Sequence, residues 1–164
     1  KGIRPDIMTF GKGIASGYQL AGVVSSSKIM NNLGKGFLGG TYGGNAISSA
    51  AAVATIDILN DENVKTHIKK IGKLIKDEIE EEYIVKEVRQ HGLMIAIEFK
   101  DEYNNNEFTS FLVDSLRDMG ILVLLSGNQG QYIRLLPSLL VEENQINFFL
   151  VSFKNILHRM DFYG

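Results

Sequence analysis

The chain has 164 residues, of which 45% are apolar, and this composition predicts a globular protein with a core of its own. A net charge of −2 argues against nucleic acid as a partner, because phosphate binding draws on clustered Lys and Arg. Zero cysteines exclude disulfides and thiolate zinc sites and fit a reducing compartment, so we expect a cytoplasmic protein. No apolar run approaches the ~20 residues that span a bilayer, and we expect no membrane partner.

Near the start, a single lysine lies between two glycines. Residues 6–10 form a short apolar run that fits a buried strand, and Gly11, Lys12 and Gly13 follow where that strand would end. Glycines on both sides allow unusual backbone angles and the close approach of a bulky ligand. An amine in partly apolar surroundings has its charged form disfavoured, which frees it to attack a carbonyl. Taken alone, these three residues fit a surface lysine in a glycine-rich turn better than a reactive lysine.

A glycine-rich stretch then leads into a helix. After a short strand at 21–25 and a loop-like segment at 28–38, residues 39–45 read GGTYGGN and open directly into a helical pattern at 46–59. Asn45 is a suitable N-cap, and the exposed N–H groups of the first turn would attract an anion. The segment alone is equally consistent with phosphate binding beside Thr41 and with a tightly packed core helix.

The rest of the chain alternates helices and strands. Apolar residues at three- and four-residue spacing predict a helix at about 62–81, in which Gly72 indicates a bend or a close contact. The acidic residues at 77–82 fit the solvated end of this helix better than a metal site. The mixed order of helices and strands after residue 62 predicts a small α+β domain whose helices cover one face of a sheet. The further predicted elements are strands at 84–89, 93–99, 121–125 and 132–136 and helices at 108–119 and 142–160.

Arg134 lies in the last predicted strand, just before Pro137. Its planar guanidinium matches a carboxylate with two parallel hydrogen bonds, which is what an amino-acid substrate presents. An arginine paired with a structural carboxylate of the same domain explains the residue as well. The three histidines have no ligand spacing, and we assign them no chemistry.

Three motifs together resemble the class III aminotransferases, which are pyridoxal-phosphate enzymes. They are Asp6, Ile7, Met8, Gly11 and Lys12; Gly40, Thr41, Gly43, Gly44 and Asn45; and the run 133–137, IRLLP. The resemblance implies that Lys12 forms a Schiff base with pyridoxal 5'-phosphate, that Thr41 binds the cofactor phosphate across a dimer interface, and that Arg134 holds a substrate carboxylate. It covers essentially the whole chain.

The resemblance also implies an α/β fold, the fold type I of pyridoxal-phosphate-dependent transferases. Residues 1–62 would be the C-terminal part of the large cofactor-binding domain, and residues 63–164 a small C-terminal α+β domain. Gln19 and Ala46 stand where the family usually has proline. The phosphate-binding glycine turn, the ring-stacking aromatic and the acid that pairs with the pyridine nitrogen precede the lysine in the family, so we expect this chain to be the C-terminal portion of an enzyme.

The expected activity is transfer of an amino group from an amino acid or a 4-aminobutyrate-like ω-amine to a 2-oxo acid such as 2-oxoglutarate, in a homodimer. An acetylornithine- or ornithine-type aminotransferase and an aminomutase remain alternatives within the superfamily. Outside it, the chain could be a non-catalytic dimerisation or binding module, or a phosphate- or nucleotide-binding protein. The last alternative lacks the Gly-x-x-x-x-Gly-Lys-Ser/Thr motif.

Overall fold

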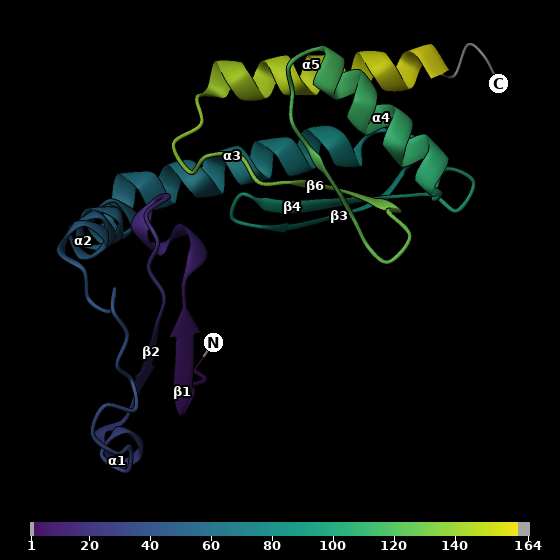
Figure 1. Cartoon of the computed structure of the whole chain (residues 1–164). Coiled ribbons are helices and arrows are strands. Elements are labelled where there is room, and N and C mark those ends of the chain that lie inside the picture. The colour runs from purple at the N-terminus through teal and green to yellow at the C-terminus, as the bar shows by residue number, and fades with distance from the viewer. Residues whose placement is uncertain (1, 161–164) are drawn as a thin grey trace. The chain divides into compact units, whose positions relative to one another are not determined.

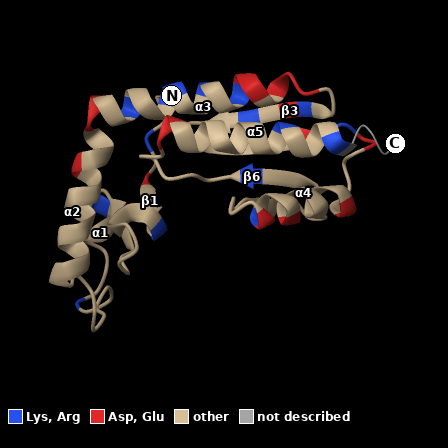
Figure 2. Ribbon diagram, turned by 90° about the horizontal axis from the view of Figure 1, so that it is seen from above, with Lys and Arg blue, Asp and Glu red and all other residues tan. Residues whose placement is uncertain are grey.

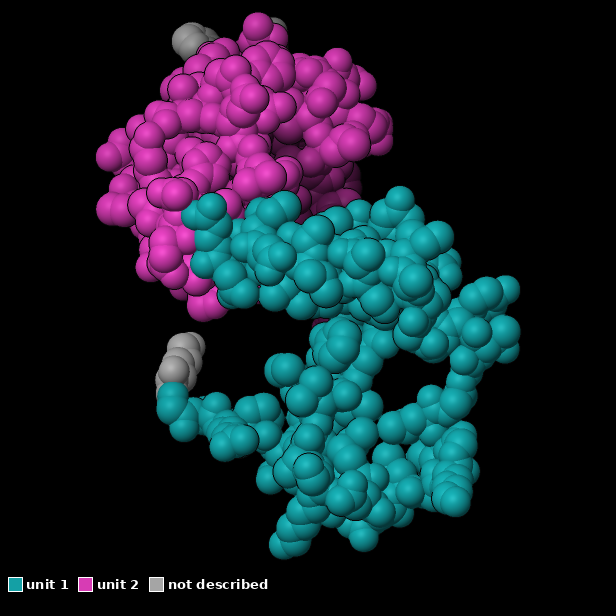
Figure 3. Space-filling model, turned by 90° about the vertical axis from the view of Figure 1, so that its left-hand side faces the viewer, with its two compact units in different colours: residues 1–61 teal, residues 62–164 magenta. Residues whose placement is uncertain are grey.

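The computed structural model describes residues 2–160, and the chain divides into two compact units, 1–61 and 62–164 (Figure 3). The assignment of the first unit to a large cofactor-binding domain stays a prediction. Within the described residues, no helix combines the length and the apolar character needed to cross a membrane.

Unit 1 is built on one antiparallel strand pair and a long helix. Strand β1 (Ile7–Phe10) pairs with β2 (Gly22–Ser25), and a 3-10 turn, Lys12–Ala15, lies between them in sequence. Phe10 lies opposite Gly22, and a Cβ at that glycine would overlap the phenyl ring. The missing side chain therefore lets the aromatic ring lie across the partner strand.

The expectation that residues 6–10 form a buried strand is wrong for the described chain. Three of the four β1 residues are exposed, among them Ile7 and Met8. The reason is that β1 has a single partner strand, since the sheet of unit 1 contains only β1 and β2. Two strands without a helix or second sheet across them cannot bury an apolar face.

Two helices complete unit 1, α1 (Ser27–Met30) and α2 (Ala46–Asn60). The predicted N-cap of α2 is confirmed, because the Asn45 side-chain oxygen accepts a hydrogen bond of 2.9 Å from the Ser48 backbone N–H. Asp57 is the only charged residue of α2, and Figure 2 shows the helix almost entirely without charge. A helix that is apolar all round is typical of one buried on every side, yet most of α2 is exposed here.

Unit 2 is a four-stranded antiparallel sheet with its helices on one face, as predicted (Figure 1). The strand order is β3-β4-β6-β5, so the last two strands are out of sequence order. The strands are β3 (Val85–His91), β4 (Met94–Phe99), β5 (Leu124–Ser126) and β6 (Tyr132–Leu135), and the helices are α3 (Glu62–Glu80), α4 (Asn106–Asp118) and α5 (Glu143–Met160).

The core of unit 2 lies between this sheet and its helices. Alternate strand residues point into it, among them Val88, Ile97 and Ile133, and the helices contribute residues such as Ile75 and Phe153. Gly72 of α3 is buried, and a Cβ there would overlap the carbonyl oxygen of Gly92 in the β3–β4 turn. The close contact predicted at Gly72 is therefore confirmed, and it sets how near the helix lies to the turn.

Strand β5 is shorter and begins later than the predicted strand at 121–125. Leu124 pairs with Arg134, and continuing that register backwards would bring Ile121 opposite Pro137. Proline has no N–H to donate to a ladder. Proline thus excludes Ile121 from the ladder, and the observed pairing begins only at Leu124, with residues 121–123 as irregular chain.

Candidate functional site

Lys12 opens the 3-10 turn that follows β1. Its φ of 52° is left-handed, a conformation that costs a residue with a Cβ on the order of 1 kcal/mol and recurs at functional sites. The turn is anchored on α2, since Ala15 is fully buried and the hydroxyls of Ser16 and Thr55 lie 2.9 Å apart. The Lys12 side chain is exposed, and within residues 2–160 no ion pair or hydrogen bond occupies its amine.

A hollow of about 510 Å³ adjoins Lys12. It is lined by Lys12 and by residues 17–21, so the turn and the segment leading into β2 form its walls. Tyr18 is 56% exposed beside it, and open space surrounds Gly13. An unpaired amine at the edge of an open hollow, on a backbone held by packing, can reach a bound molecule.

Thr41 lies in the glycine-rich turn before α2, and its side chain is exposed. Gly40 and Gly44 have open space around them, so a group the size of a phosphate could approach the backbone there. The Asn45 side chain accepts a hydrogen bond from the Ser48 backbone N–H. The positive end of the helix dipole still lies next to the glycine-rich turn. Lys12 and Thr41 thus both belong to unit 1, the first in a turn packed on α2 and the second just before that helix.

Arg134 belongs to unit 2 and lies on β6, on the sheet face opposite the helices. It lines a hollow of about 330 Å³ together with residues 89–91 and 94–96. Its Nε atom is buried without a hydrogen-bond partner, and among the described residues no ion pair engages its guanidinium. The structural carboxylate that would be the alternative partner of Arg134 is therefore absent from residues 2–160.

Two further residues on this face were not identified from the sequence, Arg89 and Glu98. Glu98 is only 8% exposed, and its carboxylate lies 2.8 Å from Arg89 Nη1 and 3.0 Å from Lys86 Nζ. Arg89 also contacts Glu87 at 2.9 Å and lies over the ring of Tyr132, 5.1 Å from its centroid. Alternation along the strand at 85–91 places Arg89 on the solvent side, but its neighbours depend on a strand order that the sequence does not show.

The charges of this network sustain one another. The hydrogen bond from Lys86, assisted by that from Arg89, holds the pKa of the Glu98 carboxyl below its ordinary value, while burial acts in the opposite direction. In return, the hydrogen bond to Glu98 raises the pKa of Lys86. Glu98 is therefore a charged carboxylate at neutral pH, and it holds two cations in place at the open face of the sheet.

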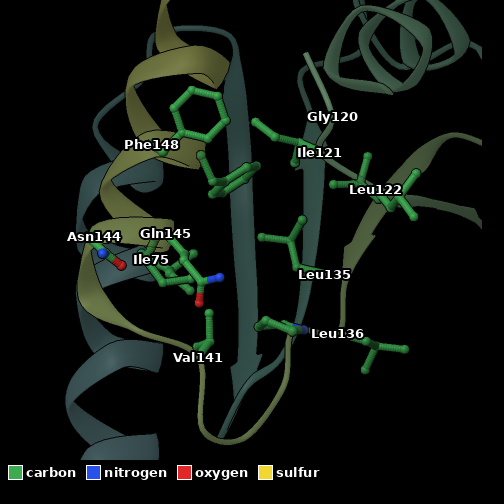
Figure 4. A pocket seen from close by; sticks show the side chains of 14 residues that line it. Ile75, Gly120, Ile121, Leu122, Leu135, Leu136, Val141, Asn144, Gln145 and Phe148 are labelled. Carbon is green, nitrogen blue, oxygen red and sulfur yellow. The ribbon is translucent and has the colours of Figure 1, made fainter. Parts of the chain in front are cut away.

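A second, apolar hollow in unit 2 measures about 490 Å³ (Figure 4). Figure 4 shows Ile75, Val141 and Phe148 on one side of it, and Ile121 and Leu135 facing them on the other. Asn144 and Gln145 are the most polar residues of its lining, which includes no titratable side chain. The hollow thus offers neither acid, base nor nucleophile.

The acidic residues at the end of α3 do not form a metal site. Among residues 2–160 no group of three or more His, Asp or Glu side chains is placed to hold a metal ion. Instead the acids form ion pairs with lysines, and Glu82 also contacts the ring of His158: the pairs are Lys73 with Asp77, Lys76 with Glu80, and Lys154 with Glu78 and Glu82. The interpretation of this segment as an ordinary charged helix end agrees with these contacts.

Comparisons with known proteins agree with the three motifs. The family profile described as Aminotransferase class-III matches residues 1–157. The chain is 35% identical over 153 residues to the 4-aminobutyrate aminotransferase GabT of Escherichia coli, covering 88% of this chain and 36% of GabT. It is 31% identical over 150 residues to the acetylornithine aminotransferase of Methanothermobacter thermautotrophicus, covering 89% of this chain and 36% of that enzyme.

A solved structure agrees with these sequence matches. A transaminase from the marine bacterium Virgibacillus superposes with a TM-score of 0.84 at 28% identity, covering 99% of this chain and 41% of that one. The chain thus spans about a third of the length of the curated relatives it matches. Because the family profile extends over nearly all its residues, this chain belongs to the class III aminotransferases.

Proposed function

We propose that this chain supplies the cofactor lysine and a substrate-binding arginine of a pyridoxal-phosphate-dependent transaminase. The class III aminotransferases depend on this cofactor. The observation that carries the proposal is Lys12, an unpaired amine on a left-handed backbone beside an open hollow, in a motif that resembles the one carrying the family's cofactor lysine. The amino group would pass from an amino acid or ω-amine to a 2-oxo acid such as 2-oxoglutarate.

The residues of unit 1 fit the cofactor. Lys12 offers a nucleophilic amine, with room for a ring in the hollow beside it. Thr41, with its hydroxyl exposed, and the N-terminal end of α2 offer hydrogen-bond donors and a positive field suited to a phosphate. By resemblance to the family, Thr41 would serve the cofactor of the partner subunit, which makes the active protein a homodimer.

When bound, pyridoxal phosphate supplies an aldehyde that condenses with amines and a ring that accepts electrons. Lys12 would hold the cofactor through its amine until a substrate amine takes its place. Once released, the Lys12 amine would serve as the base that takes the proton from the substrate carbon and as the acid that gives it back. The left-handed turn suits this double role because it fixes the Lys12 backbone, from which the flexible side chain can move the amine.

Arg134 would hold the substrate carboxylate. Its guanidinium has no anionic partner among residues 2–160, so a bound carboxylate would complete two charge-assisted hydrogen bonds without displacing an existing pair. A carboxylate is common to amino acids, to 4-aminobutyrate-like donors and to 2-oxo acids, so one arginine can serve both half-reactions. The similarity of this chain to GabT, a 4-aminobutyrate aminotransferase by name, favours an ω-amine as the amino donor.

The proposal is tested by reduction with borohydride after incubation of the 164-residue chain with a low concentration of pyridoxal phosphate, followed by peptide mapping. We expect one predominant adduct, on Lys12. The Lys12→Ala variant should lose it, and Lys35→Gln, which removes another exposed lysine of unit 1, should keep it. Adducts spread over the exposed lysines in proportion to their number would contradict a specific role for Lys12.

A further inference from the structure

We propose that Arg89 is a second carboxylate-binding residue, which together with Arg134 clamps one carboxylate of the substrate on the open face of the unit 2 sheet. The identity of the ligand as substrate rests on the proposed function. The clamp itself rests on the register of the strands, on the hollow between them and on the hydrogen-bonding state of the two guanidinium groups.

The strand register brings the two arginines into one row. Arg89 of β3 pairs with Ala96 of β4, and Ala96 pairs in turn with Arg134 of β6. Neighbouring strands are about 4.8 Å apart, so the two arginine backbones are separated by about 10 Å. Side chains opposite one another in a ladder point to the same face, and both arginines can therefore reach over Ala96.

Ala96, in the middle of this row, has a small side chain, which leaves room for a ligand between the two arginines. Arg89, Ala96 and Arg134 all line the hollow of about 330 Å³, with Met94 and His91 from the turn end of the sheet. The guanidinium of Arg134 has no anionic partner among the described residues, so a carboxylate in this hollow would neutralise its charge. The same carboxylate would accept hydrogen bonds from the Arg89 donors that Glu87 and Glu98 leave unused, so that both arginines bind it.

The existing contacts leave both groups able to bind an anion. Arg134 has no anionic partner among the described residues, and its Nε is buried without a hydrogen bond. The ion pairs of Arg89 to Glu87 and Glu98 both use Nη1. Glu98 lies in the neighbouring row of the sheet, opposite Glu87 and Tyr132, so it holds the guanidinium from the side away from Ala96.

This arrangement resembles other preorganised sites, in which a buried residue fixes the one that touches the ligand. Glu98, only 8% exposed, and the ring of Tyr132 limit the conformations of Arg89 before any ligand arrives. Arg89 would then lose little side-chain entropy on binding. Glu98 is a positioning residue in this scheme, and Arg89 is the one that touches the carboxylate.

The test is a titration of the ¹⁵N-labelled 164-residue chain with butyrate, followed through the Nε–H signals of its arginines. We expect saturable shifts of the Arg89 and Arg134 signals. Butyramide, which has the same shape without the charge, should cause none. Arg89→Gln and Arg134→Gln should each weaken butyrate binding about tenfold, the loss expected when charge-assisted hydrogen bonds are removed. Arg117→Gln, which removes an exposed arginine of α4, should leave binding unchanged.

The Arg89→Lys variant controls for misfolding, because it keeps a positive charge beside Glu98 and removes only the planar guanidinium group. It should fold and still bind butyrate several-fold more weakly. Unchanged affinity in both Arg89 variants, or no saturable shift at Arg89 in a chain whose sheet amides show it folded, would overturn the clamp. Lys12 plays no part in this titration, so failure of the pyridoxal phosphate test and failure of the clamp are separate results.

Discussion

Lys12 and Arg134, the residues proposed to bind cofactor and substrate, lie on two different kinds of backbone. Lys12 stands on a left-handed turn between two glycines, where local strain is balanced by the packing of Ala15 and the Ser16–Thr55 contact. Arg134 stands in the middle of a regular ladder, where the register alone decides its neighbours. The Lys12 side chain therefore extends from a fixed turn, which suits the proton transfer proposed for it, and Arg134 projects from a rigid ladder, which suits the carboxylate binding proposed for it.

Glu98 gives the first prediction at the scale of single residues, and it concerns pH. The pKa of its carboxyl is lowered from 4.5 by Lys86 and Arg89. A carboxyl with a depressed pKa contributes stability that is fully present above the ordinary value and is lost as the pH falls through the folded value. Glu98→Gln should therefore reduce the free energy of unfolding at pH 7 by about 1–3 kcal/mol. It should also flatten the acid dependence below about pH 4.5, as urea unfolding by circular dichroism would measure.

The matched control is Glu102→Gln, because Glu102 is exposed and lies in the connection that follows β4, the strand of Glu98. Surface substitutions of this kind change stability by less than about 0.5 kcal/mol. If Glu98→Gln and Glu102→Gln gave the same acid slope, the Glu98 network would have no role in the stability of unit 2.

At the scale of elements, the contact between α3 and the β3–β4 turn gives the second prediction. On helix propensity alone, Gly72→Ala should stabilise α3 by about 1 kcal/mol. The new methyl group would overlap the backbone carbonyl oxygen of Gly92, which cannot turn aside as a side chain would. Overpacking of this kind costs about 1–3 kcal/mol, so we expect a net loss of stability and a lower urea midpoint.

Thr66→Ala, at an exposed position of the same helix, isolates the propensity effect. It should leave stability unchanged or raise it by a few tenths of a kcal/mol. A Gly72→Ala chain that was as stable as Thr66→Ala would show that the turn can move away from the helix, and that Gly72 does not set their separation.

The elements could be predicted from the sequence wherever one physical signal dominates. The three-residue and four-residue spacing of apolar residues predicts α3 and α5, and Asn45 predicts the start of α2. The late start of β5 could not be predicted, because it depends on a register with β6, which is set by contacts distant in sequence. The burial of β1 was predicted wrongly, because a local apolar pattern says nothing about which partner elements are present.

The same distinction applies to the candidate site. Lys12, Thr41 and Arg134 stand out in the sequence because each lies in a short motif, and their roles stay proposals. Arg89 and Glu98 lie in no such motif. They become neighbours of Arg134 and Tyr132 only through the strand order β3-β4-β6, which depends on contacts distant in sequence.

At the scale of the whole molecule, the two units differ in how they bury apolar surface. Unit 2 has a contiguous core between its sheet and three helices. In the described part of unit 1, the buried apolar side chains are Ala15 and Ala52, both small. In hydrogen exchange, the amides of unit 1 should be less protected than those of unit 2, because segments with few buried contacts open at a low free energy.

The exposed apolar surface of α2 gives the last prediction. Ile47 is 68% exposed and Val53 60% exposed on a helix with a single charge, and uncovered apolar surface of this kind favours association. We expect the 164-residue chain to self-associate in sedimentation experiments. Burial of a large aliphatic side chain contributes about 1.5–3 kcal/mol. The double variant Ile47→Gln/Val53→Gln should therefore raise the dissociation constant at least about tenfold. Met119→Gln, at an exposed site after α4, should have little effect, whereas equal association in all three chains would place the contact on another surface.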